Sequence, residues 1–179
     1  MRHPPATLAE VTVKTIVTHT VTYFIAGVLA YSLLDYPRLI SSTTLAVLMR
    51  PLQDRMVVAG TLFQPIRGLL FGVAFYLLRE LFFERKTGWL LMWGTLVVFG
   101  VFGTFGAPPG SLEGFVYTTV PLSVQLKFLP EVLLQSLALS WILFQWVNHP
   151  EKKWRHWIMG TAFVIVLLLP TLGLIASTQ

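Results

Sequence analysis

The sequence contains no cysteine and little charge. Without cysteine the chain cannot form disulfides, thiolate metal sites, iron–sulfur clusters or a cysteine nucleophile. Charged residues make up 12% of the 179 residues, against about 25% in soluble domains. Hydrophobic residues make up 55%, and the mean hydropathy is +0.70. This composition is typical of a helical membrane protein and leaves no room for a separate soluble domain.

The usual enzyme motifs are also absent. The chain has no G-x-S-x-G, no H-E-x-x-H, no P-loop and no dinucleotide-binding glycine pattern. Two glutamates four residues apart, Glu80 and Glu84, are too few to hold a metal ion by themselves. They lie among basic residues, which is typical of a solvated charged loop. We therefore expect a non-catalytic protein without a metal site.

The net charge of +5 does not indicate nucleic-acid binding. The basic residues form short clusters at the ends of apolar runs, where they act as topology signals and contact lipid headgroups. The expected partners are therefore membrane lipids, together with other membrane protein chains or a second copy of this chain.

Five apolar runs predict membrane-spanning helices. An apolar run of about 18 residues or more is long enough to cross a bilayer. We expect an all-α integral membrane protein in which residues 1–179 form a single domain, a bundle of about five transmembrane helices. The predicted spans are 14–34, 56–78, 88–106, 131–147 and 157–176. Of the connections, 36–54 is predicted to lie in the interface, and 107–130 to form a re-entrant or lid-like segment.

The basic residues also predict an orientation. With the N-terminus inside, eight of them lie on the inner side and four on the outer side, which agrees with the positive-inside rule. The inner set is Arg2, Lys14, Arg79, Arg85, Lys86, Lys152, Lys153 and Arg155; the outer set is Arg38, Arg50, Arg55 and Lys127. The first run lacks a clear cleavage site, so we expect an uncleaved first span, with the N-terminus inside and the C-terminus outside.

Arg67 lies in the middle of the second predicted span. An unpaired arginine at the centre of a membrane helix costs about 2.5 to 3.5 kcal/mol on insertion scales. We expect either a structural role, as an ion-paired or snorkelling arginine, or a role in a polar interior that holds an anionic or lipidic ligand. The residues predicted to share that interior are Gln64, Glu113, Glu131 and Gln135, with Glu113 and Glu131 as possible anionic partners.

His19 lies inside the first predicted span, on one face with Thr12, Thr15 and Thr22. A histidine at such a position hydrogen-bonds inside the bundle, relays protons, or ligates haem or a chlorophyll-type pigment. The sequence leaves these three alternatives open. The same applies to the G-x-x-x-G of Gly68 and Gly72, which predicts close helix packing either within the fold or between two copies.

Three functions follow as hypotheses. The first is an accessory or structural subunit of a larger membrane complex, which agrees with the small size and the absence of catalytic motifs. The second is a carrier or channel for a small polar or lipidic solute that passes Arg67. The third is a haem- or pigment-binding membrane subunit that uses His19.

Overall fold

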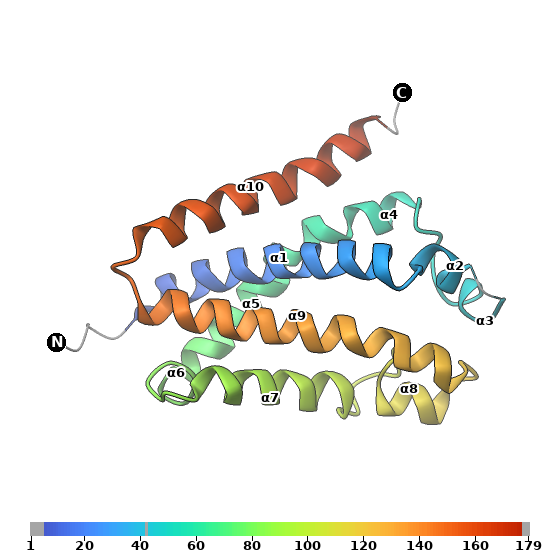
Figure 1. Cartoon of the computed structure of the whole chain (residues 1–179), viewed down its shortest axis with the longest axis horizontal. Helices are drawn as coiled ribbons and strands as arrows, with labels where there is room; N and C mark the ends of the chain where they lie inside the picture. The colour runs from blue at the N-terminus through green and yellow to red at the C-terminus, as the bar shows by residue number, and fades with distance from the viewer. Residues whose placement is uncertain (1–5, 42, 177–179) are drawn as a thin grey trace.

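The described residues of the computed structural model, 6–41 and 43–176, form helices and turns without a strand. Four helical segments are long and apolar enough to cross a membrane. They are α1 (Leu8–Leu33), the segment Arg55–Leu77, α9 (Leu122–Asn148) and α10 (Lys153–Ala176), which run alongside one another in Figure 1. The all-α class predicted from the sequence is confirmed, and four of the five predicted spans correspond to these segments.

The third predicted span, 88–106, is shorter than expected. Helix α7 covers Gly88–Val101, and its 14 residues extend about 21 Å, against the roughly 30 Å of a hydrocarbon core. A tight turn follows the helix: a Cβ atom on Gly103 would lie 2.3 Å from the carbonyl oxygen of Phe99. Hydropathy extends the run to residue 106, but this backbone turn ends the helix earlier.

Two other helices begin earlier than their apolar runs. Thr7 caps α1 by accepting a hydrogen bond from the backbone N–H of Glu10 (3.2 Å), so a polar first turn precedes the apolar part. Helix α9 begins at Leu122 and continues through Pro130. We expected the fourth span to begin at 131, after this proline, but proline is tolerated inside membrane helices when other groups satisfy the freed carbonyl.

The second span is not one continuous α-helix. It consists of α4 (Arg55–Val58), the 3₁₀-helix η1 (Ala59–Phe63) and α5 (Gln64–Leu77). Asp54 caps α4 by accepting from the N–H of Met56 (2.7 Å). Pro65 stands at the start of α5, where its missing N–H costs least. The helix type therefore changes close to Arg67.

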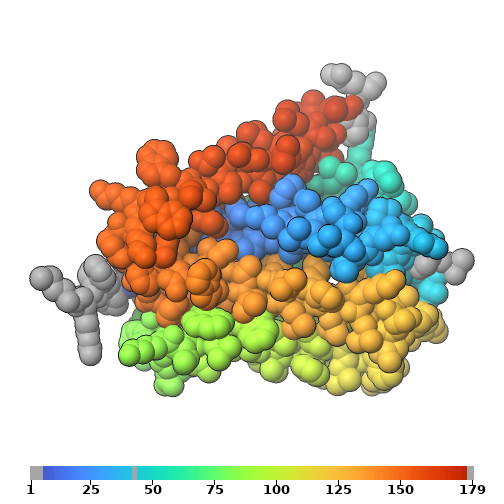
Figure 2. Space-filling view, in the orientation of Figure 1, coloured from blue at the N-terminus to red at the C-terminus, as the bar shows by residue number. Residues whose placement is uncertain are grey.

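Helix α1 lies at the centre of the bundle and packs against α5, α9 and α10, while α7 packs on α9 (Figure 1). The view in Figure 2 shows α1, α9 and α7 side by side, with α10 along one edge. We call the end where α5 leads into α6 (Arg79–Phe82) the α6 end, and the end that carries α8 (Leu112–Tyr117) the α8 end. Helix α1 begins at the α6 end and α10 ends at the α8 end.

Gly68 and Gly72 bring α5 into contact with the backbone of α1. A Cβ on Gly68 would lie 2.7 Å from the Cα of Ile16, and one on Gly72 would lie 2.6 Å from the Cα of Thr12. Both distances are shorter than any normal carbon contact. The G-x-x-x-G pattern therefore packs two helices of the same chain, which is the first of its two predicted roles.

A buried lysine ties α1 to α9 at the α6 end. Lys14 is 4% exposed and forms an ion pair with Glu10 one turn earlier. It also donates to the carbonyl oxygen of Trp146 at 3.0 Å. A buried ammonium group requires such partners because it has lost its water shell.

The α8 end carries short helices with exposed apolar side chains. Residues 36–54, predicted to lie in the interface, form α2 (Tyr36–Ile40) and α3 (Thr43–Ala46). Tyr36, Leu39 and Leu45 are buried there, whereas Val47 is 85% exposed. Residues 107–130, predicted as a re-entrant or lid-like segment, contain α8 and the first two turns of α9.

Candidate functional site: a lateral groove beside a buried polar cluster

His19 lies between two glutamines from different helices. Its Nε2 is 3.2 Å from Oε1 of Gln64 in α5, and its Nδ1 is 3.5 Å from Nε2 of Gln135 in α9. The amide of Gln64 is oriented by a second bond, from Nε2 to the carbonyl of Gly60 (2.9 Å). Because an amide oxygen only accepts and an amide nitrogen only donates, this arrangement fits a neutral imidazole protonated on Nε2. Three of the predicted site residues are thus brought together.

This environment does not favour haem or pigment ligation by His19. An axial ligand needs a ring nitrogen free to face the metal, and here both nitrogens have glutamine partners. The side chain is 2% exposed, and the ring of Phe71 packs against it edge-on at a centroid distance of 5.1 Å. Of the alternatives for His19, the structure favours hydrogen bonding inside the bundle. A proton-relay role stays a prediction.

A groove opens between α1 and α9 next to this cluster. Its volume is about 670 Å³, within the range of small-molecule sites. Most of its lining is apolar, and small side chains such as Ala26 and Ala138 keep it open. We call it the lateral groove; it is lined by Thr22, Ile25, Ala26, Leu29, Ala30, Leu33, Leu34, Trp89, Pro130, Glu131, Leu134, Gln135, Leu137, Ala138, Trp141 and Ile142.

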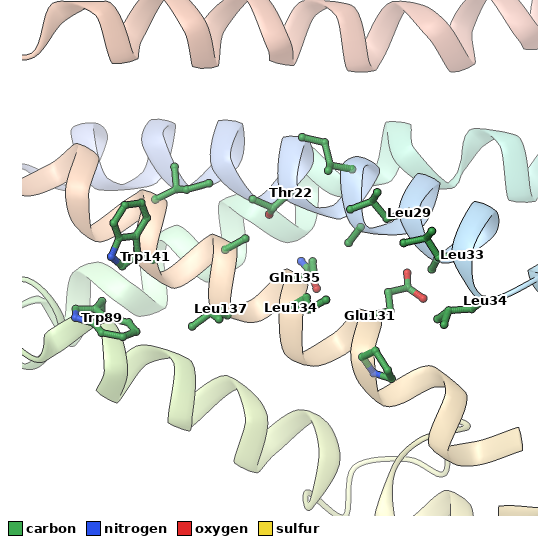
Figure 3. A pocket seen from close by; sticks show the side chains of 16 residues that line it. Thr22, Leu29, Leu33, Leu34, Trp89, Glu131, Leu134, Gln135, Leu137 and Trp141 are labelled. Atoms are coloured by element: carbon green, nitrogen blue, oxygen red, sulfur yellow. The ribbon is translucent and has the colours of Figure 1, made fainter. Parts of the chain in front are cut away.

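The charged and amide side chains of the lateral groove lie away from its two tryptophans (Figure 3). Glu131 stands near one end, beside Leu33 and Leu34, and Gln135 near the middle, whereas Trp89 and Trp141 stand at the opposite end. The ten residues from Glu131 to Trp141 correspond to about 15 Å of helix. The groove therefore has a carboxylate near one end, which we call its polar half, and an otherwise mostly apolar lining.

Glu131 is held at the polar half by a tyrosine. Its carboxylate accepts a hydrogen bond from the hydroxyl of Tyr36 in α2. Burial, and then the hydrogen bond to Glu131, raise the pKa of Tyr36 above its ordinary value, so this hydroxyl keeps its proton and stays a donor. Leu33 and Leu34, at the end of α1, line the groove beside the carboxylate. Glu131 is thus level with the end of α1.

Arg67 is placed differently from the expectation of an ion-paired interior residue. Its side chain is exposed, and within residues 6–41 and 43–176 it forms no ion pair or hydrogen bond. Glu131 is bonded to Tyr36 instead, and Glu113 lies in α8 at the α8 end, in the first turn after the cap Ser111. Arg67 follows Gln64 by three residues on α5, so it lies about one helical turn from the residue that contacts His19.

Gln125 is a structural residue that the sequence did not single out. Its buried amide binds the segment before α9 from two sides: Oε1 accepts from the N–H of Gly110 (2.7 Å), and Nε2 donates to the carbonyl of Gly114 (2.8 Å) and to Oγ1 of Thr118 (3.1 Å). Nothing in the local pattern distinguishes it from an exposed glutamine, since its partners lie in a separate loop. This residue fixes the predicted lid against α9.

Replacing Gln125 by leucine is expected to release this segment without unfolding the bundle. The partly buried N–H of Gly110 would lose its acceptor, at a cost of up to about 1–3 kcal/mol unless water reaches it. The carbonyl of Gly114 would lose one of its donors and keep those of Thr118. Limited proteolysis should then cut between residues 102 and 120 at least several times faster than in the wild type. Equal cleavage rates in both proteins would show that the amide bonds do not hold the segment.

The described residues contain no group of three His, Asp or Glu side chains placed to hold a metal ion. Comparisons of the chain with protein-family models, curated proteins and solved structures found no significant match. The fold and the site therefore define a structural class, and they do not assign the chain to a family. The chain is an all-helical protein with four helices of membrane-spanning length and a lateral apolar groove.

Proposed function

We propose that this chain is a non-catalytic multi-pass membrane protein that binds, and in doing so carries, an amphiphilic molecule in the lateral groove. The observation that carries the proposal is the uneven lining of the groove: the polar groups of Glu131 and Gln135 lie away from the two tryptophans, and most of the remaining lining is apolar. A molecule with one long apolar chain and a polar head matches this layout. It enters sideways from the bilayer, since the groove opens between two helices.

The proposal includes the topology. In it the four long helices and the shorter α7 make five passes, with the N-terminus inside and the C-terminus outside. The α6 end then faces inward, where Arg79, Arg85 and Lys86 agree with the positive-inside rule. Glu131 lies toward the outer face, level with the end of α1, where a polar head reaches the carboxylate without crossing the bilayer.

The lining also restricts the head group. Glu131 already accepts one hydrogen bond from Tyr36, and its remaining lone pairs only accept. Gln135 offers an amide that is shared with His19. The head group therefore carries O–H or N–H donors, as in a long-chain alcohol or amine, and a phosphate placed against Glu131 would be repelled.

A blocking variant tests the groove directly. Ala138→Trp places a large side chain inside it, and Val164→Trp is the matched control on the exposed face of α10, where Val164 is 54% exposed. The probe is a long-chain alcohol that carries a photoreactive diazirine, added to the purified protein in nanodiscs. We expect Ala138→Trp to reduce crosslinking at α1 and α9 at least about tenfold, equivalent to about 1.4 kcal/mol. The control should crosslink like the wild type.

The role of an accessory subunit is the second candidate, because small residues allow close helix contact and Ala26, Ala30 and Ala138 line the groove. A helix of another chain would then fill it.

Native mass spectrometry of protein taken gently from its own membrane separates the two roles. A mass excess of one amphiphile, lost in Ala138→Trp, supports the carrier; a second chain lost in the same variant supports the subunit. Unchanged crosslinking in Ala138→Trp contradicts binding of the probe in the groove.

A further inference from the structure

The lateral groove has a similar length along each of the two helices that form its sides. Its lining runs from Thr22 to Leu33 on α1 and from Pro130 to Ile142 on α9. At about 1.5 Å per residue, these stretches are about 17 and 18 Å long. The hydrocarbon core of a bilayer is roughly 30 Å thick. In the proposed topology the groove therefore ends inside the apolar layer.

Two tryptophans from different helices stand at the end of the groove opposite Glu131 (Figure 3). Trp141 projects from α9, and Trp89 stands at the start of α7. An indole is the largest side-chain ring and has only two rotatable bonds, so it fills space with little loss of conformational entropy. The far end of the groove is thus lined by bulky rings, whereas alanines line its middle.

The backbone that carries Trp89 is held in place on both sides. Gly88, just before it, leaves no room for a Cβ atom against the carbonyl oxygen of Phe82, whose side chain is 3% exposed in the core. One turn after Trp89, the indole N–H of Trp93 donates to the carbonyl oxygen of Leu133 in α9 (3.2 Å). Helix α7 is therefore fixed against α9, and the ring of Trp89 cannot move away with a loop.

We propose that Trp89 and Trp141 limit the alkyl chain of the bound amphiphile to about twelve carbons, an inference that rests on the proposed function. With the head group at Glu131, the chain has the ten residues to Trp141, or about 15 Å of helix, in which to lie. An extended chain advances about 1.25 Å per carbon, because C–C bonds of about 1.5 Å zigzag at tetrahedral angles. About twelve carbons therefore reach from the carboxylate to the tryptophans.

The preference arises from exclusion of long chains and not from a gain with each carbon. The chain enters from lipid, whose tails are as apolar as the leucines that line the groove. Each added carbon therefore gains little as long as it fits. A chain longer than the groove has to bend at the two indole rings or displace them, and it loses packing in doing so. Short and medium chains should thus bind alike, and long chains should bind much more weakly.

The experiment uses the full chain in nanodiscs and a dodecanol derivative that carries a photoreactive diazirine. Unlabelled decanol, dodecanol, hexadecanol and octadecanol compete with this probe at equal mole fractions in the lipid. For the wild type we expect decanol and dodecanol to suppress crosslinking at α1 and α9 equally. Octadecanol should suppress it at least about tenfold more weakly, equivalent to a tenfold lower affinity. The order of the four alcohols then gives the limit directly.

Trp141→Ala should remove this discrimination, because it opens the far end of the groove. Octadecanol should then compete within about threefold of dodecanol, a difference of less than 1 kcal/mol. Trp141 is 50% exposed, so its truncation leaves the core intact. Trp89→Ala opens the same end from α7 and should give the same shift, which keeps the test valid if one variant does not fold. The matched control is Trp157→Ala on α10, where the ring is 79% exposed; it should behave like the wild type.

The blocking variant Ala138→Trp separates failure of this inference from failure of the proposed function. If Ala138→Trp prevents crosslinking but all four alcohols compete equally in the wild type, the groove binds the probe and long chains leave it sideways, so only the length limit is overturned. An unchanged preference in both Trp141→Ala and Trp89→Ala also overturns the limit. If Ala138→Trp crosslinks like the wild type, the proposed function and the length limit both fail.

Discussion

Gly72→Ala is expected to lower the free energy of unfolding by about 1–3 kcal/mol, the range typical of overpacking. The added methyl group would lie 2.6 Å from the Cα of Thr12 and 3.1 Å from its Cγ2. Since the first of these atoms belongs to the backbone of α1, no rotamer change relieves the clash, and α1 and α5 must separate. Tryptophan fluorescence during unfolding in mixed micelles gives the measurement.

Gly68→Ala should act in the same way, because its Cβ would lie 2.7 Å from the Cα of Ile16. The double variant should cost less than the sum of the two, since one separation of the helices relieves both clashes. Gly94→Ala and Gly160→Ala are the matched controls: nothing lies within 4 Å of either added Cβ. These controls should be neutral, or stabilising by up to about 1 kcal/mol. Equal effects at all four positions would refute the close contact of α1 and α5.

Gln64→Leu is expected to destabilise the protein by about 1–2 kcal/mol. It leaves the Nε2–H of His19 buried without an acceptor, and the cost of such an orphaned donor is about 1–3 kcal/mol. Side-chain hydrogen bonds between membrane helices contribute less, with a mean of about 0.6 and a maximum of about 1.7 kcal/mol, so the upper part of the range of about 1–3 kcal/mol is not expected. Gln135→Leu should cost less, because its bond to Nδ1 is longer, at 3.5 Å.

The double variant His19→Leu/Gln64→Leu provides the control for this prediction. Removing donor and acceptor together leaves no orphaned group between them, so the double variant should be closer to the wild type than Gln64→Leu alone. The coupling energy from this cycle measures the hydrogen bond itself. A double variant less stable than either single variant would mean that His19 is held by more than its glutamines.

The helical class and the positions of most long helices could be predicted from the sequence because apolar runs of this length are specific to membrane helices. Their ends were less predictable. Helix α1 begins after its cap Thr7, within residues that are too polar for an apolar run. Helix α9 begins at Leu122, ahead of a proline that suggested a later start. At Gly103 a backbone turn ends α7 inside an apolar run. Hydropathy averages the polarity of the side chains in a segment, and it does not detect the caps and backbone turns that end a helix.

The sequence predicted several residues of the candidate site, but it predicted fewer of the contacts between them. Helical spacing placed His19, Gln64 and Gln135 on interior faces, and the structure brings these three together. Spacing along single helices does not say which faces meet. Glu131 was considered as a partner for Arg67, whereas the structure bonds it to Tyr36, a residue in a short helix that the sequence only assigned to the interface. The lateral groove has no signature in the sequence, since it lies between two helices that are distant along the chain.

The contact of Lys14 with the carbonyl of Trp146 joins positions 132 residues apart. Since α1 is synthesised before α9, this bond forms only after the later helix has been made. Until then only Glu10, one turn away, is placed to neutralise the ammonium group. In the proposed membrane topology we therefore expect the start of α1 to stay near the headgroups until α9 is in place, and the burial of Lys14 to be a late step in the assembly of the bundle.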